Sequence, residues 1–213
     1  MAEKQLTLLP GQYLTIEEAV DTEITIQRSR FIASVRRARD REEFDLRLKE
    51  IEAALPKASH HCWAYRFEGA HIIEHATDDG EPSGTAGRPI LGAIKKYGLL
   101  NTMLVVTRYY GGIKLGVRGL ISAYGDTALF ALEKAKIVVA EPLLQIRFEM
   151  GYEFYNLLLA RLEKYALPQE AIKVSFENII SGEITLPNSI LASLTADLEQ
   201  ISANQTLFQF RTD

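Results

Sequence analysis

The sequence contains few of the residues from which disulfides and metal sites are built. Its 213 residues include one cysteine and four histidines. The single cysteine, Cys62, cannot form an internal disulfide, which fits a reducing compartment. No apolar run is long enough to span a bilayer. The first residues, MAEKQLTLLPGQYL, lack the apolar core of a signal peptide. We therefore expect a cytoplasmic protein without a membrane segment.

The scarcity of cysteine and histidine argues against a metal site, and we expect no cofactor. His60, His61 and Cys62 are adjacent in a predicted strand, residues 60–67. Neighbouring residues of a strand point to opposite faces, so His60 and Cys62 could share a metal ion but His61 could not join them. No second cysteine or histidine pair lies at ligand spacing. Nothing nearby indicates a lowered thiol pKa for Cys62. The simpler interpretation is a buried strand with a polar edge.

Charge is distributed unevenly along the chain. Residues 1–140 hold 19 basic and 18 acidic residues, a net charge of +1, and residues 141–213 hold 5 and 10, a net charge of −5. The acidic part repels polyanions, so a contact with nucleic acid would have to use local basic patches of the first part. One such patch contains Arg28, Arg30, Arg36, Arg37 and Arg39. Its simpler interpretation is a solvated strand edge.

The hydrophobic pattern predicts an α+β protein with two domains, residues 1–140 and 141–213. In the first part we expect strands at 12–19, 22–27, 30–35, 60–67 and 101–106. The first two of these form either a hairpin or successive strands. Helices are expected from Asp40 to Pro56, through residues 86–94, and over about 117–136. Asp40 and Glu43 have the spacing of a capping box.

After Pro142 the pattern becomes regular. Strands are predicted at 143–149, 171–177, 179–186 and 206–211, and helices at 152–165 and 188–202. This is the βαββαβ order of a ferredoxin-like domain. This part has no histidine, cysteine or glycine-rich loop, and it favours a packing or protein-interaction module.

Glycine is concentrated in residues 78–119, which contain nine of the fourteen glycines. The run begins with DDGEPSGTAGRP, whose Asp-Asp-Gly and Pro-Ser-Gly segments are typical of turns. Ser83 or Thr85 is expected to cap the following helix. The free N–H groups at its start, beside Gly84 and Gly87, would suit an anion, and Arg88 could supplement them. The loop is not a Walker A motif.

A second glycine-rich loop follows the apolar strand 101–106. It reads TRYYGGIKLGVRG and also leads into a helix. We expect a second candidate anion site here, whose cations could bind phosphate groups and whose aromatic rings could stack on bases. The candidate residues are Arg108, Tyr109, Tyr110, Gly111, Gly112, Lys114 and Arg118. The alternative is that both loops are tight connections and that the tyrosines cover the edge of the core.

The two loops together resemble the signature of the IMPACT family, including its bacterial YigZ-like branch. The residues that carry the resemblance are DDGEPSGTAGRPIL, LLNTMLVVTRYYGGIKLGVRGLISAY and, upstream, HHCWAYRF. The resemblance implies an N-terminal domain of the ribosomal protein S5 domain 2-like fold and a ferredoxin-like C-terminal domain. Eukaryotic members carry an extra N-terminal domain and restrain a stress kinase that controls translation initiation, and we do not carry that role over. Bacterial members have been suggested to bind nucleic acid or to act near the ribosome, so the resemblance implies a link to translation.

These observations leave three hypotheses open. The first is a non-enzymatic, translation-linked regulator that binds RNA, the ribosome or a protein partner through the glycine-rich face. The second is an enzyme that binds a phosphate or nucleotide with loop 78–88, where Asp78, Asp79 and Glu81 could hold Mg²⁺ or act as a base. In the third, the acidic C-terminal domain docks a protein partner.

Overall fold

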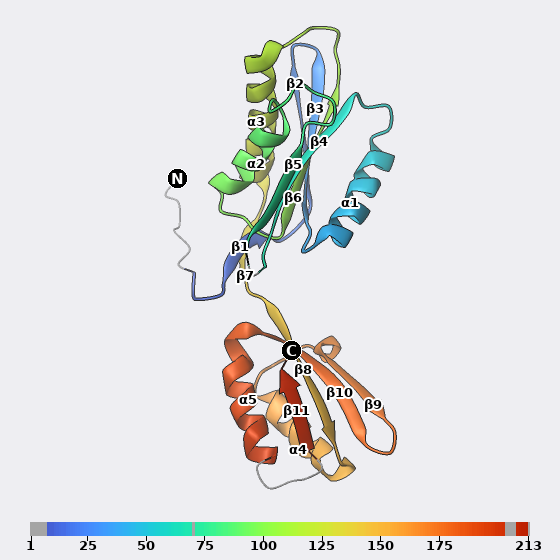
Figure 1. Ribbon diagram of the computed structural model, residues 1–213, viewed down its shortest axis with the longest axis vertical. Helices are drawn as coiled ribbons and strands as arrows, with labels where there is room; N and C mark the ends of the chain where they lie inside the picture. Colours follow the sequence, from blue (N-terminus) through green and yellow to red (C-terminus); the bar gives the residue numbers. More distant parts are fainter. Residues whose placement is uncertain (1–7, 70, 203–207, 213) are drawn as a thin grey trace. The chain divides into compact units, whose positions relative to one another are not determined.

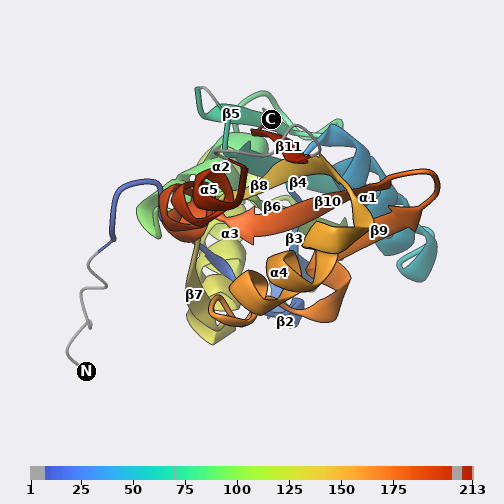
Figure 2. The same cartoon turned by 90° about the horizontal axis from the view of Figure 1, so that it is seen from below.

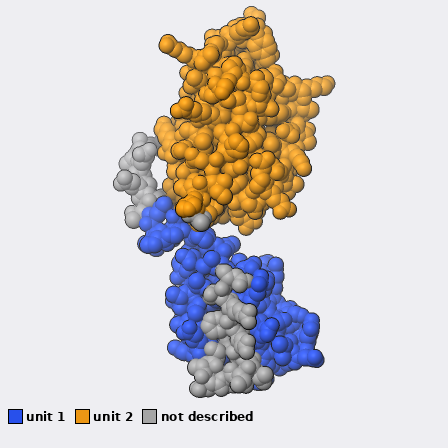
Figure 3. Space-filling model, in the orientation of Figure 1, with its two compact units in different colours: residues 1–12, 141–213 blue, residues 13–140 orange. Residues whose placement is uncertain are grey.

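The computed structural model describes residues 8–69, 71–202 and 208–212. The chain forms two compact units, which Figure 3 shows in different colours. The larger unit comprises residues 13–140, and the smaller unit comprises residues 141–213 together with residues 1–12. Residues 8–12 therefore group with the smaller unit, whereas the sequence pattern placed them in the first domain. In the described part, no helix is both long and apolar enough to cross a membrane.

A five-stranded antiparallel sheet forms the centre of the larger unit. Its strand order is β2-β3-β6-β4-β5. The strands span Val20–Ile26 (β2), Ser29–Arg37 (β3), His60–Phe67 (β4), Ile73–Thr77 (β5) and Thr102–Tyr109 (β6). The central strand β6 is buried from Thr102 to Arg108, as expected for a strand that is covered on both faces.

Helices cover both faces of this sheet. Figure 1 shows α1 (Arg41–Ala54) on one side and α2 (Gly87–Lys96) with α3 (Gly116–Lys134) on the other. The alternation of β4 matches this arrangement, because Cys62 and Ala64 belong to the core under α2 and α3. Trp63 and Tyr65 pack with α1 on the opposite face. The predicted split of strand 60–67 into two faces is confirmed.

The start of α1 follows its sequence signals with one difference. The Asp40 carboxylate accepts a hydrogen bond from the Glu43 amide at 2.8 Å. In a capping box Glu43 would return this bond to the amide of Asp40. Here its carboxylate accepts from the amide of Arg39 instead, at 3.0 Å. The apolar stripe of the helix packs on the sheet as predicted, through Phe44, Leu48, Ile51 and Leu55.

The first predicted pair of strands does not form a hairpin. Strand β1 (Tyr13–Ile16) pairs with β7 (Ile137–Ala140), which follows α3. Strand β2 pairs with β3 through a turn in which Gln27 and Arg28 have φ values of 44° and 67°. The alternation of residues 12–27 indicated extended structure correctly, but a period of two contains no information about the partner strand.

The smaller unit has the βαββαβ order that the sequence predicts. Its elements are β8 (Leu143–Met150), α4 (Tyr152–Glu163), β9 (Ile172–Phe176), β10 (Ile180–Pro187), α5 (Asn188–Ser202) and β11 (Phe208–Thr212), with a short 3₁₀ turn at Gln169–Ala171. The antiparallel sheet has the order β11-β8-β10-β9 (Figures 1 and 2). Both helices contribute to one core with this sheet, Leu158 from α4 and Leu194 from α5 among them. Residues 206 and 207 of the predicted last strand lie outside the described residues.

Phe44 provides a test of the packing of α1 on the sheet. It is fully buried, with ring centroids 4.6 Å from Trp63 and 4.9 Å from Tyr65. We expect Phe44→Ala to lower the free energy of unfolding by about 3–5 kcal/mol. Leu46→Ala on the same helix is the control, because Leu46 is 56% exposed, and its effect should stay within about 0.5 kcal/mol. Urea unfolding followed by the fluorescence of Trp63 measures both, and equal effects would contradict the assignment of the buried face.

Candidate functional site

The two glycine-rich loops meet at the end of β6. One loop, residues 78–86, connects β5 to α2, and the other, residues 110–115, connects β6 to α3. Arg108 in β6 joins them, since its Nη1 lies 2.6 Å from Oε1 of Glu81 in the first loop. The candidate site residues that the sequence predicts thus lie at one end of the sheet. Arg88 is the exception and is described below.

Asp78 occupies the start of α2. Its carboxylate accepts hydrogen bonds from the amides of Gly84, Ala86 and Gly87 at 2.7, 2.9 and 2.9 Å. Burial alone would raise the pKa of this carboxyl, but the three amide hydrogen bonds outweigh it and hold the pKa below its usual value. The helix begins after Ala86, which has no side-chain cap. The expected cap by Ser83 or Thr85 is wrong, and the Thr85 hydroxyl donates to the carbonyl of Pro82 instead, at 2.6 Å.

This arrangement changes what the first loop can bind. The amides of Gly84, Ala86 and Gly87 already have an acceptor that carries a negative charge. An anion at this helix start would have to displace Asp78. Gly87 also packs closely, because a Cβ on it would lie 2.7 Å from the carbonyl oxygen of Thr77. Gly87 therefore serves an internal contact of the loop with β5.

Glu81 is the second carboxylate that the protein uses internally. The side chains of Glu81 and Arg108 are 5% and 6% exposed. The Tyr124 hydroxyl of α3 donates to the same Glu81 oxygen at 2.8 Å, and Arg108 also donates to Ser29 at 3.3 Å. Burial is the main cause that raises the pKa of Tyr124, and the neighbouring Cys62 and Glu81 raise this pKa further. Arg108 is therefore a buried partner within the fold and has little surface to offer a ligand.

Tyr124 was assigned only to the apolar stripe of its helix by the sequence pattern. Its hydroxyl was the available signal, because a buried tyrosine normally needs a hydrogen-bond partner. The pattern could not show that this partner would be Glu81.

Asp79 attaches the same loop to β4. Its carboxylate accepts from the amide of His61 at 2.6 Å, and its carbonyl accepts from Nδ1 of His60 at 2.7 Å. Cys62 donates from Sγ to the carbonyl of Asp78 at 3.0 Å, and burial raises the pKa of this thiol to about 12. Such a thiol is not a nucleophile near neutral pH. Among the described residues no group of three or more histidine, cysteine or carboxylate side chains could hold a metal ion.

The second loop is held at its base. A Cβ on Gly111 would lie 2.0 Å from the carbonyl of Arg28, so only glycine fits there. The Tyr109 hydroxyl donates to the carbonyl of Pro56 at 3.1 Å, and Arg30 lies 4.4 Å from the centre of its ring. Tyr110 differs from Tyr109, because it is 48% exposed.

Beyond Gly111 the loop presents cations to solvent. Lys114 and Arg118 are exposed, and so is Arg28 on the adjoining turn of β2 and β3. Within the described ranges, none of these three takes part in an ion pair, whereas Asp78, Asp79 and Glu81 accept the hydrogen bonds given above. We call Arg28, Tyr110, Lys114 and Arg118 the basic edge.

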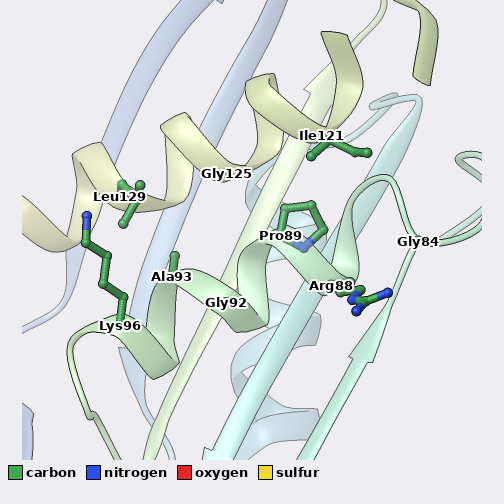
Figure 4. Close-up of a pocket in the computed structure, with 9 residues that line it drawn as sticks. All are labelled: Gly84, Arg88, Pro89, Gly92, Ala93, Lys96, Ile121, Gly125 and Leu129. Carbon is green, nitrogen blue, oxygen red and sulfur yellow. The ribbon is translucent and has the colours of Figure 1, made fainter. Parts of the chain in front are cut away.

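Arg88 points elsewhere. It lies on α2 at one end of a groove between α2 and α3, which Figure 4 shows with its lining residues. The sequence placed Arg88 with the other cations because it follows the first loop directly. The groove is also lined by Gly84 of the first loop, but by no residue of the basic edge.

The fold and the loops define a two-domain α+β protein whose polar loop cluster closes one end of an antiparallel sheet. Residues 27–132 match the Impact N-terminal domain. An IMPACT family member of Haemophilus influenzae is 30% identical, with 93% of this chain and 97% of that protein covered. This chain belongs to the IMPACT family.

Other relatives agree with this assignment. The member YigZ of Escherichia coli is 29% identical, with 92% and 93% of the two chains covered. The member YvyE of Bacillus subtilis is 44% identical over 59% of this chain and 58% of that protein. A crystal structure described as that of an hypothetical protein matches with a TM-score of 0.72 and 28% identity, and it covers 95% of this chain and 97% of its own.

Asp78 predicts a pH dependence of stability. We expect Asp78→Asn to lower the free energy of unfolding by about 1–2 kcal/mol at neutral pH, because the charged acceptor at the helix start is lost. The folded-state pKa is below the unfolded value, so this stability is complete above about pH 3.9 and is lost as the pH falls through the lowered pKa. The difference between the two proteins should therefore shrink on acidification, as urea midpoints would show. Asp126→Asn, at an exposed position of α3, is the control; a constant difference at all pH values would contradict the capping role.

The buried ion pair predicts strong coupling between its two residues. Removing either partner alone, by Arg108→Met or Glu81→Gln, should cost about 3–5 kcal/mol, because the other charge stays buried without a partner. The double variant should cost clearly less than the sum of the two. A double-mutant cycle of unfolding free energies measures this, and additive costs would show that the two charges do not depend on each other.

Proposed function

We propose that this protein is a non-enzymatic, translation-linked regulator that binds RNA, free or in the ribosome, through the basic edge. One observation carries the proposal. The carboxylates beside the loops are engaged in hydrogen bonds within the fold, while three cations and one aromatic ring remain exposed. The link to translation comes from the family that the sequence resembles, and the cytoplasm is the location we propose with it.

The chemistry of the basic edge fits a single-stranded nucleic acid. Lys114, Arg118 and Arg28 can contact phosphates, and such contacts release counterions and give salt-dependent affinity. Tyr110 is free to stack on a base, which is a sequence-tolerant contact. Its ring already lies 5.3 Å from the Arg108 guanidinium, which limits its orientation. Pre-positioning of the ring reduces the entropy lost on binding.

The smaller unit has a different character. Its residues 141–213 carry a net charge of −5, which is unfavourable for a polyanion. A protein partner is the more suitable ligand for it, and docking of such a partner by this domain remains the second part of the proposal.

The hypothesis of an enzyme that binds phosphate with loop 78–88 has less support. The N–H groups that would hold the phosphate donate to Asp78. Glu81 is neutralised by Arg108, and Asp79 accepts from the amide of His61. A ligand that competes for these groups would have to dismantle the loop, and these carboxylates are poorly placed to bind Mg²⁺ or act as a base.

Salt-dependent RNA binding tests the proposal. Anisotropy titrations with labelled oligouridine between about 50 and 200 mM salt should show affinity that falls steeply as salt rises. The variant Lys114→Ala/Arg118→Ala should reduce the slope of log K against log salt by roughly 1.4, the value for two phosphate contacts on a single strand. Tyr110→Ala should weaken binding by about 1–3 kcal/mol with less change in slope.

The matched control is Arg37→Ala/Lys49→Ala. Arg37 is exposed at the opposite end of β3, and Lys49 is exposed on α1. This control removes the same charge without touching the basic edge, so it should leave the slope nearly unchanged. Absence of binding to both oligouridine and ribosomes, salt-independent binding, or an equal loss in the control would overturn the proposal.

A further inference from the structure

The larger unit has a groove on its surface that the basic edge does not include. It lies between α2 and α3 and has a volume of about 460 Å³. In Figure 4, Pro89 and Ala93 line one wall and Ile121 and Leu129 the other, while Arg88 and Lys96 stand at opposite ends. Ile121 is 42% exposed, and Val117, one helical turn before it on α3, is 58% exposed. The groove is therefore apolar along its length and basic at its ends.

Two glycines in helix interiors form part of the groove, and the fold itself does not require them. A Cβ on Gly92 would meet no atom within 4 Å, and one on Gly125 would meet only Pro89, at an ordinary 3.7 Å. Neither glycine has a positive φ. Glycine is less favourable than alanine inside a helix. By contrast, Gly87 and Gly111 could not carry a Cβ without a backbone clash.

The charges at the two ends limit what can occupy the groove. Arg88 and Lys96 are eight residues apart on α2, about 12 Å along the axis. Both are exposed, and neither belongs to an ion pair of the described residues. No carboxylate lines the groove. An occupant should therefore present an apolar middle with small side chains and a carboxylate toward each end.

We infer that this groove docks an acidic amphipathic helix of a partner protein. A helix needs no backbone partner, and its apolar face can enter the groove with anchors at helical spacing. Because Gly92 and Gly125 have no side chains, the backbone of the partner helix can lie close to the backbones of α2 and α3. Acidic residues of that helix about two turns apart would then reach Arg88 and Lys96.

Other occupants fit these features less well. An extended strand would need an unpaired sheet edge to bind. The groove has no such edge, because the backbone groups of α2 and α3 are hydrogen-bonded within their own helices. A nucleic acid would set its phosphates along an apolar floor. A fatty acid carries one carboxylate, whereas the groove offers a cation at each end. In a two-fold pair of grooves, Arg88 of one copy would approach Lys96 of the other, and like charges would repel.

Selection of displayed helical peptides on the full chain tests the inference. The library holds amphipathic helices about four turns long, with small or branched apolar residues on one face and Glu, Lys or Ser at the flanking positions. Peptides with two glutamates about two turns apart should be enriched. Their affinity, measured by anisotropy, should fall about tenfold or more in Arg88→Glu/Lys96→Glu, whereas Lys49→Glu on α1 should not change it.

A variant whose new side chain fills the groove distinguishes a loss of docking from a general effect on the fold. Gly92→Leu should abolish peptide binding without lowering the melting temperature, since leucine favours a helix more than glycine does. Ser122→Leu adds the same side chain at an exposed position of α3 outside the groove and should leave binding intact. RNA binding by the basic edge should be unchanged in Gly92→Leu.

Several outcomes would overturn this inference. One is a selection that enriches no peptide, and another is enrichment of lysine or serine in place of glutamate at the flanking positions. A third is equal binding of the selected peptides to the wild type and to Gly92→Leu. A wild-type dimer that becomes monomeric in Gly92→Leu, measured by sedimentation, would assign the groove to a second copy instead.

Discussion

The ion pair between Arg108 and Glu81 connects the elements on which the loop cluster depends. Arg108 belongs to the central strand, Glu81 to the loop before α2, and Tyr124, which donates to the same carboxylate, to α3. Burying two charges is costly, and it becomes acceptable only when each is paired and hydrogen-bonded. Here the pair fixes the position of the first loop relative to the sheet and to α3. The surface beside it then depends on this buried contact.

This internal pairing decides which charged residues remain exposed. The loops near the end of β6 contain three acidic residues, Asp78, Asp79 and Glu81, beside several basic ones, and the fold separates the two kinds. Its carboxylates satisfy backbone amides, an arginine and a tyrosine, while Lys114 and Arg118 remain at the surface. A run of mixed charge thereby becomes a locally basic edge on a protein whose overall charge is −4. Net charge alone would have indicated the opposite preference for a polyanion.

Glycine serves at least two purposes in the larger unit. Gly87 and Gly111 permit backbone contacts that no side chain would allow, and the loops depend on them. Gly92 and Gly125 lie inside helices, and their missing side chains leave a groove open. The sequence shows only that glycine is abundant between residues 78 and 119. The distinction depends on what lies opposite each Cα.

Local periodicity in the sequence determined most of the elements. The apolar stripe of α1, the two faces of β4 and the βαββαβ order all follow from spacing along the chain, because burial acts on nearby residues in a regular way. The pairing of β1 with β7, the capping of α2 by Asp78 and the burial of Arg108 were decided by the tertiary structure alone. Each of these features either joins residues that are distant in sequence or depends on which polar groups lie within hydrogen-bond distance in the folded chain. For the same reason the sequence located the glycine-rich segment but could not tell its structural charges from its exposed ones.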